Sequence, residues 1–147
     1  MAYNPNYRDA EKARQDQRER VYALTLLSGI GNIAALFLHI NGIATIMLGW
    51  LVGGMVGALV VAGIQGRTDD YYNQLTSSGL RLMALGLGTL LLLLWAQTET
   101  ALAARWIPGL AVLAQDALLL AMILTLLFHL GYAYSYLRDR WAAGGPE

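Results

Sequence analysis

Two histidines and one isolated aspartate are the residues of this sequence best suited to chemistry. His39 and His129 are its only imidazoles, and Asp116 stands between two apolar runs. A histidine beside a carboxylate supports proton transfer, and two histidines can ligate a haem iron from opposite sides. Whether they act together depends on the elements that position them.

Those elements are apolar helices. Of 147 residues, 56% are hydrophobic and 14% are charged, and the mean hydropathy is +0.45. A soluble domain carries about 25% charged residues. The chain has no cysteine, which removes disulfides, thiolate metal ligands and Fe–S clusters, and its net charge of zero gives no reason to expect nucleic-acid binding. The composition predicts one compact integral membrane unit.

Four stretches are long enough to cross a bilayer, which needs about 20 apolar residues per helix. They cover residues 21–40, 43–64, 80–96 and 109–137. Asn41-Gly42 is a turn signal, so the first two spans form a hairpin. Thr68, followed by two aspartates, resembles an N-cap for the third helix, and Pro108 suits the first turn of the fourth. We expect an all-α, four-helix antiparallel bundle made of two helical hairpins.

The two ends of the chain are polar. Residues 1–20 form a charged arm of good helix formers that should continue the first span as a helix, and residues 138–147 form a short tail. Nine of the ten basic residues fall in the arm, the middle loop region or the C-terminal end: Arg8, Lys12, Arg14, Arg18, Arg20, Arg67, Arg81, Arg138 and Arg140. Only Arg105 lies in the connection before the fourth span. The positive-inside rule then predicts both termini in the cytoplasm, with the bundle in a bacterial inner membrane.

His39 ends the first span and Asp116 begins the most apolar part of the fourth, so both should lie near the outer face. They either pair across the two helices or are hydrated separately among the headgroups. His39 and His129 differ in depth by about 15 Å at 1.5 Å per residue, which opposes a haem between them. The sequence has no metal-spaced histidine pair, no phosphate-binding glycine loop and no G-x-S-x-G motif. We therefore expect no cofactor, no metal and no enzymatic activity.

Two further polar side chains fall inside the spans. Asn32 lies at mid-membrane and should find a hydrogen bond on another helix, with Thr125 as the candidate partner. His129 lies at the depth of Thr25 and Ser28 on the first span. Ionisable and amide groups at such depth are candidates for function, although most serve as packing contacts between helices.

Small residues form two neighbouring stripes on the second span. Since lipid supplies little hydrophobic drive between helices, small residues that let backbones approach decide how helices pack. Two such faces predict that this helix sits centrally and touches two partners. The alternative is that one stripe lies outside and docks another protein or another copy. The stripes consist of Gly49, Gly53 and Gly57, and of Gly54, Ala58, Ala62 and Gly66.

The sequence favours a non-catalytic accessory, assembly or scaffold subunit that docks to a larger membrane complex or to itself. Two other hypotheses stay open. One is an oligomeric channel or membrane-permeabilising protein, lined weakly by polar residues of the first span. The other is a protein that binds a lipid, quinone or pigment between its helices, with Trp50, His39 or His129 as the polar anchor.

Overall fold

The computed structural model describes residues 5–43, 45–64, 69–100, 107 and 109–143, and the described residues contain helices and no strand. The helices are α1 (Pro5–Ile40), α2 (Ile46–Gly63), α3 (Asp70–Thr100), α5 (Leu110–Gln115) and α6 (Ala117–Ala143). Four of them, α1, α2, α3 and α6, contain a stretch long and apolar enough to cross a membrane. The all-helical class and the four spans are confirmed, and they indicate an integral membrane protein.

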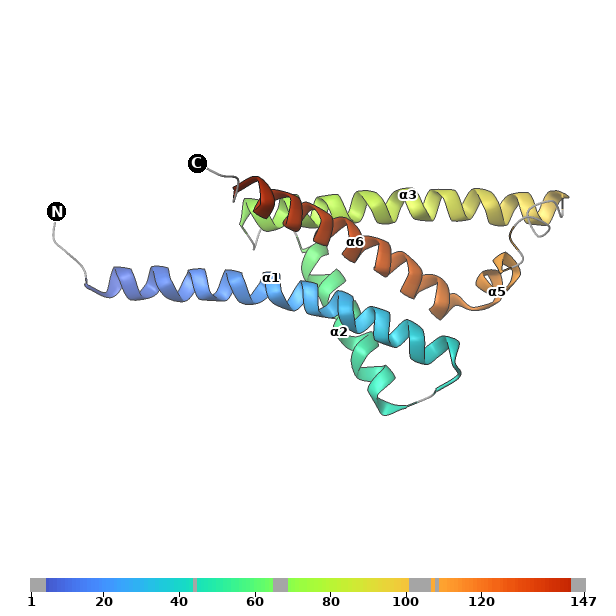
Figure 1. The fold of residues 1–147 in the computed structure, drawn as a ribbon, viewed down its shortest axis with the longest axis horizontal. Helices are drawn as coiled ribbons and strands as arrows, with labels where there is room; N and C mark the ends of the chain where they lie inside the picture. Colours follow the sequence, from blue (N-terminus) through green and yellow to red (C-terminus); the bar gives the residue numbers. More distant parts are fainter. Residues whose placement is uncertain (1–4, 44, 65–68, 101–106, 108, 144–147) are drawn as a thin grey trace.

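The first helix is continuous, as predicted for the charged arm and the first span. Its 36 residues reach about 54 Å at 1.5 Å per residue, and its N-terminal part projects beyond the other helices (Figure 1). Gly42 ends it with a φ of +68°, a conformation that glycine adopts without strain. The N–H groups of Ile43 and Gly42 donate to the carbonyls of Leu38 and His39, at 2.9 and 3.0 Å. This is the Schellman pattern, which supplies donors to carbonyls that the helix end leaves free.

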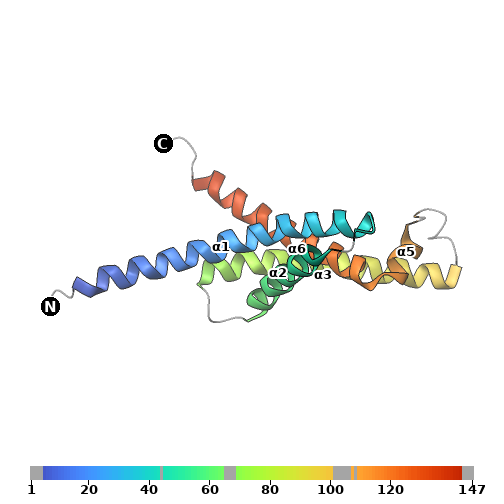
Figure 2. The same cartoon turned by 90° about the horizontal axis from the view of Figure 1, so that it is seen from below.

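The second helix is shorter than predicted and lies elsewhere than expected. It begins at Ile46 instead of Ile43, and it crosses α1 obliquely at the edge of the molecule (Figures 1 and 2). Its main packing partner is α1, whereas α3 packs chiefly on α6, and α6 also packs on α1. The prediction of a central helix was wrong, because one face of α2 is enough to hold it and its other faces stay uncovered.

Aspartates fix the starts of two helices. Asp69, directly before α3, accepts a hydrogen bond from the backbone N–H of Tyr72 at 2.8 Å. It therefore fills the N-cap role assigned to Thr68, which lies outside the described residues. Asp116 does the same for α6, accepting from the N–H of Leu119 at 2.9 Å.

The predicted single helix over 109–137 is therefore wrong. Asp116 has extended backbone angles, φ −114° and ψ 91°, and separates the short α5 from α6. The reason is local: an aspartate side chain that caps the next helix competes with continuation of the previous one. The last span then runs to Ala143, six residues beyond the predicted end. Pro108 lies outside the described residues.

Helices α3 and α6 approach each other closely, backbone against backbone, where they cross. A Cβ atom added to Gly131 would lie 2.8 Å from the carbonyl oxygen of Ser78 and 2.9 Å from the Cα of Gly79. A Cβ added to Gly79 would lie 2.6 Å from the carbonyl oxygen of Phe128. Two backbones touch here only because neither glycine has a side chain, as in other close helix pairs in lipid.

Candidate functional site

Asp69 links the start of α3 to α1. Besides capping α3 with one oxygen, it accepts a hydrogen bond with the other, Oδ2, from the hydroxyl of Tyr22 at 2.6 Å. The Nε of Arg18 lies 3.6 Å from the same oxygen. The Arg18 side chain is 59% exposed, so solvent screens this ion pair and it adds little to stability. The hydrogen bond from Tyr22 is the specific part of this contact.

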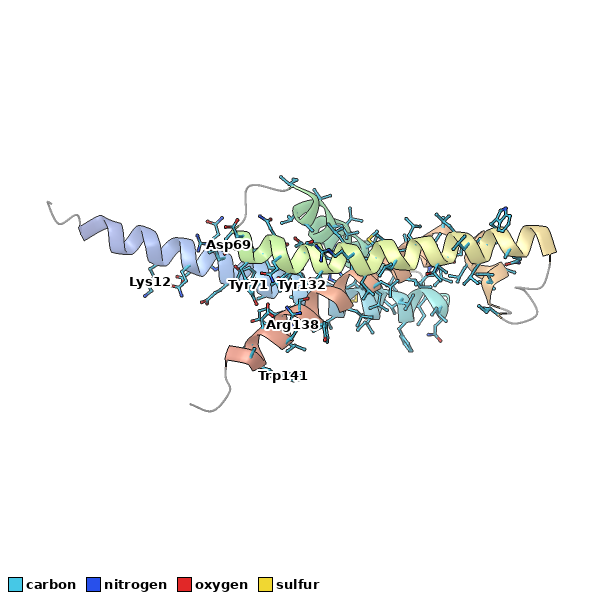
Figure 3. The ribbon with its side chains drawn as sticks, turned by 90° about the horizontal axis from the view of Figure 1, so that it is seen from above. Lys12, Asp69, Tyr71, Tyr132, Arg138 and Trp141 are labelled. Atoms are coloured by element: carbon cyan, nitrogen blue, oxygen red, sulfur yellow. The ribbon has the colours of Figure 1, made fainter. Side chains whose placement is uncertain are left out.

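Four tyrosines surround this point. Tyr22 stacks on Tyr72 with ring centroids 5.9 Å apart and meets the edge of Tyr71 at 5.8 Å. Tyr72 in turn meets Tyr132 of α6 at 6.0 Å, and both rings are fully buried. Figure 3 shows Asp69, Tyr71 and Tyr132 close together where α1, α3 and α6 meet. Aromatic pairs at these distances add to the burial of their area, so the cluster joins the three helices.

Two hydrogen bonds follow along α1, away from Asp69, of which the first is buried and the second partly buried. The hydroxyls of Thr25 and Tyr72 are 3.1 Å apart, and Oγ of Ser28 is 3.0 Å from Nε2 of His129. Thr25 and His129 are both more than nine-tenths buried. The predicted common depth of His129, Thr25 and Ser28 is confirmed, and the structure adds that Ser28 is the partner of the imidazole.

Asn32 is fully buried, but its predicted partner was wrong. Its Nδ2 donates to the backbone carbonyl of Met122 at 3.0 Å. Thr125 instead donates to the carbonyl of Ala121 in its own helix at 2.8 Å, a bond that threonine commonly makes in helices. Among the described residues, Oδ1 of Asn32 and Nδ1 of His129 have no hydrogen-bond partner.

His39 and Asp116 form the pair that was one of two alternatives from the sequence. Nε2 of His39 lies 2.6 Å from Oδ2 of Asp116. The carboxylate also accepts from the N–H of Leu119 through its other oxygen. The hydrogen bond from Leu119, and then the one from His39, lower the pKa of Asp116 below its ordinary value. The pair ties the last turn of α1 to the first turn of α6.

These contacts share one face of α1. The polar side chains recur every three or four residues, with one longer gap before His39, and each reaches another helix or a helix cap. Sequence reasoning named several of them singly and missed the stripe, although the helical spacing was the signal that could have revealed it. The polar stripe comprises Arg18, Tyr22, Thr25, Ser28, Asn32 and His39.

An apolar cluster interrupts the polar stripe between Asn32 and His39. Ala35 of α1, Met55 of α2 and Met122 of α6 are at most 3% exposed and pack with partly buried leucines and a valine. Asn32 and His39 are seven residues apart, or about 10 Å along the helix. The described side chains therefore form no continuous polar path from Asp69 to Asp116.

The small residues of α2 divide between two environments. Ala62 is buried, whereas a Cβ added at Gly49, Gly53, Gly54 or Gly57 would have no neighbour within 4 Å. Given 100° per residue, Gly49, Gly53 and Gly57 lie opposite the buried Met55. We call these three residues the open glycine face. Gly54 and Ala58 lie on the flank of α2, beside α1.

The chemistry available to this arrangement is limited. A serine near a histidine resembles a nucleophile and its base, but catalysis needs a third group that orients the base and donors for an oxyanion. The second nitrogen of His129 has no partner among the described residues. The same residues contain no group of three His, Asp or Glu side chains that could hold a metal ion. His39 and His129 belong to two separate contacts and do not face each other across a shared site.

Fold and contacts together define a helical protein with four candidate membrane spans, a polar stripe inside it and an open glycine face outside it. Comparison with protein-family models, with curated proteins and with solved structures gives no match.

Proposed function

We propose that this chain is a non-catalytic integral membrane subunit that docks through the open glycine face of α2 to a transmembrane helix of a larger complex or of a second copy. The observation that carries the proposal is the position of Gly49, Gly53 and Gly57. A Cβ added to any of the three meets no described atom within 4 Å, and Gly57 also lines a groove between α2 and α1. Glycines spaced by four residues on a lipid-facing surface let another helix approach closely.

The packing of α2 supports this role. Met55 and Ala62 on one face hold the helix on α1, so the opposite face is not needed for folding. The charged arm at the start of α1 offers a second surface, to a soluble partner, because Lys12 and residues 15–20 are exposed. A subunit of this kind needs no cofactor, no metal and no catalytic residue, and binds membrane lipid around its remaining faces.

The proposed orientation follows from the basic residues. We infer two antiparallel helical hairpins in a bacterial inner membrane, with both termini and the loop between α2 and α3 in the cytoplasm. The chain has no native cysteine, so single-cysteine variants report topology directly. In intact cells, Thr45→Cys should react with a membrane-impermeant maleimide, and Lys12→Cys should react only after lysis. The reverse pattern would overturn the orientation.

The test of docking is a pair of matched substitutions. Gly53→Leu adds bulk to the open glycine face, and Gly88→Leu adds the same bulk to an exposed position of α3, where a Cβ also meets nothing within 4 Å. Protein extracted gently from its native membrane is sized by native mass spectrometry. We expect wild type and Gly88→Leu in an assembly larger than the 16.0 kDa chain, and Gly53→Leu alone. Migration of the wild type as a free chain would contradict the proposal.

An oligomeric pore, the second hypothesis, receives less support. From Ile46 to Gly63 the described helix carries no polar side chain other than the indole of Trp50, and the polar stripe of α1 faces inward. A pore lined by α2 would therefore present only apolar groups to ions. Liposomes loaded with a fluorescent dye should not leak at high protein content.

A further inference from the structure

A groove runs between α1 and α2 on the side of the molecule where the two helices cross. Its volume is about 420 Å³, within the range of small-molecule sites. The residues that matter for its chemistry are Thr25, Ser28 and Gly31 from α1, and Trp50, Gly54 and Gly57 from α2, with aliphatic side chains between them. Along α1 the lining extends from Val21 to Gly31, about 15 Å at 1.5 Å per residue.

The lining selects a neutral ligand. None of the described residues that line it is charged, and its polar side chains are the hydroxyls of Thr25 and Ser28 and the indole of Trp50. An ionic headgroup placed here would lose its hydration without a counter-charge, which is costly in a low-dielectric environment. A neutral group with a carbonyl or hydroxyl oxygen would meet partners of matching polarity.

Ser28 is the side chain that can bind such an oxygen. It is half-buried and lines the groove, while its Oγ lies 3.0 Å from Nε2 of His129. If Nε2 carries the imidazole proton, it donates to Ser28, whose hydroxyl is then free to donate to a carbonyl. If the proton is on Nδ1, Ser28 donates to the histidine and accepts from a ligand hydroxyl. The pair therefore accommodates both a carbonyl and a hydroxyl at one position.

Trp50 gives a second, independent indication. Leu51, its neighbour, contacts Gly31, with 3.4 Å between the leucine Cδ2 and a Cβ added to the glycine. Gly31 lies halfway along the apolar part of α1, so Trp50 sits near the membrane midplane with its side chain 79% exposed. Tryptophan usually lies at the membrane interfaces, where its N–H stays hydrated. An indole at mid-depth beside a groove is suited to stack on a planar ring.

Glycines shape the wall opposite Ser28. Gly54 and Gly57 have no described atom within 4 Å of an added Cβ, so part of the α2 side of the groove is bare backbone, between Trp50, Leu51, Ala58 and Val61. Bare backbone leaves room for a flat ring, and the aliphatic side chains at the ends suit a hydrocarbon tail.

We propose that the groove between α1 and α2 binds a neutral isoprenoid lipid of the quinone or quinol class. The ring lies between Trp50 and the glycine wall, one ring oxygen bonds to Ser28, and the tail leaves toward the bilayer. This site is on the flank of α2 and shares only Gly57 with the open glycine face, so ligand binding at Ser28 and Trp50 does not require docking at Gly49 and Gly53.

The test is a fluorescence titration of the purified full chain in nanodiscs with decylubiquinone. Trp95, Trp106 and Trp141 are replaced by Phe, which leaves Trp50 as the reporter. Three variants are compared in this background: Gly54→Leu fills the groove, Ser28→Ala removes the hydroxyl and Ser28→Thr keeps it. Gly88→Leu is the matched control, because it adds the same bulk at an exposed position of α3, away from both the groove and the open glycine face.

Saturable quenching is expected in the parent and in Gly88→Leu. Gly54→Leu should weaken binding at least tenfold, and Ser28→Ala about fivefold, the effect of one hydrogen bond, with recovery in Ser28→Thr. Quenching that rises linearly without saturation, or is equal in Gly54→Leu and Gly88→Leu, would overturn the proposal. So would complete displacement of decylubiquinone by a short-chain phospholipid, because the occupant would then be an ordinary membrane lipid.

Discussion

Glycine has opposite surroundings in two regions of this molecule. At the crossing of α3 and α6, Gly79 and Gly131 lie against the backbone of the facing helix, where a methyl group would collide. On α2, Gly49, Gly53 and Gly57 lie in open space. In the first region glycine serves the fold of the chain itself. In the second region an added Cβ would touch none of the described residues, which is why we propose that these glycines serve a partner.

The two regions are also held in different ways. The helices α1, α3 and α6 share tyrosine stacking, buried hydrogen bonds and a His–Asp pair in addition to the glycine crossing. The attachment of α2 is apolar, through Met55 and its neighbours. Polar contacts at membrane depth have fixed geometry, so they specify how helices sit. Apolar contacts specify the position of a helix less strongly, because lipid tails can replace the neighbouring helix at little cost in free energy.

The largest expected effect compares one methyl group in each region. Gly131→Ala places a Cβ against Ser78 and Gly79 backbone, which forces α3 and α6 apart and should lower the free energy of unfolding by about 2–3 kcal/mol. Gly53→Ala meets nothing and should leave it unchanged or raise it by up to about 1 kcal/mol through helix propensity. Unfolding in SDS, followed by circular dichroism, measures both. Equal losses would mean that the open glycine face contributes to the fold.

A smaller loss of stability is expected at Asn32, which joins α1 to α6 through its hydrogen bond to Met122. Asn32→Ala removes the hydrogen bond to Met122 and leaves a void, and should cost about 1 kcal/mol in the same unfolding assay. Asn32→Leu restores the volume and removes the unpartnered Oδ1, so its loss should be smaller. If leucine proved worse than alanine, the amide would be needed for something beyond packing, such as a bound water.

The link between Tyr22 and Asp69 should be weaker still. Tyr22→Phe keeps the stacking on Tyr72 and removes only the hydroxyl, near the polar end of the fold, and we expect a loss of about 0.5 kcal/mol. Tyr134→Phe is the control, because that side chain is 68% exposed. Losses of the same size in both variants would show that the bond to Asp69 contributes nothing specific.

The smallest effect belongs to Asp116, whose side chain is 34% exposed, and it depends on pH. Its folded-state pKa is lowered from the ordinary value of 3.8, so its contribution is fully present above that pH and is lost as the pH falls through the folded-state pKa. Melting of the wild type and Asp116→Asn should therefore differ at pH 7 and converge in acid below the folded-state pKa, because the protonated carboxyl, like the amide, keeps the cap of α6 without the charge. Asp116→Ala also loses the cap and should be the least stable of the three at pH 7. A difference between the wild type and Asp116→Asn that persists in acid would contradict the role of the carboxylate.

Much of the fold could be predicted because the signals are local. The four spans follow from runs of apolar residues, and the end of α1 follows from Asn41-Gly42. The errors have local and non-local causes. The fourth span was predicted as one helix across Asp116 because apolar residues flank that residue on both sides. Aspartate is a good N-cap, and here it starts a new helix. The partner of Asn32 was wrong because depth alone does not say which carbonyl on α6 an amide reaches.

The candidate sites were predictable only in part. The depths predicted from position along the spans placed His39 near Asp116 and His129 near Ser28, and the structure has both pairs in contact. The stripes on α2 could be seen in the sequence, but nothing in their spacing distinguishes a covered glycine from an open one. The groove beside Ser28 depends on the oblique crossing of α1 and α2, and no pattern of residues in the sequence predicts that crossing.

By itself, then, the sequence determined which segments are helical, where the first helix ends and which faces carry polar or small side chains, since these depend on hydrogen bonds and spacing within a few residues. Only the tertiary structure decided which glycines touch a backbone, which polar groups pair and where α2 leaves a groove. In lipid, apolar side chains gain little by choosing a neighbouring helix over hydrocarbon. Helix placement therefore depends on close, directional contacts between residues far apart in the chain.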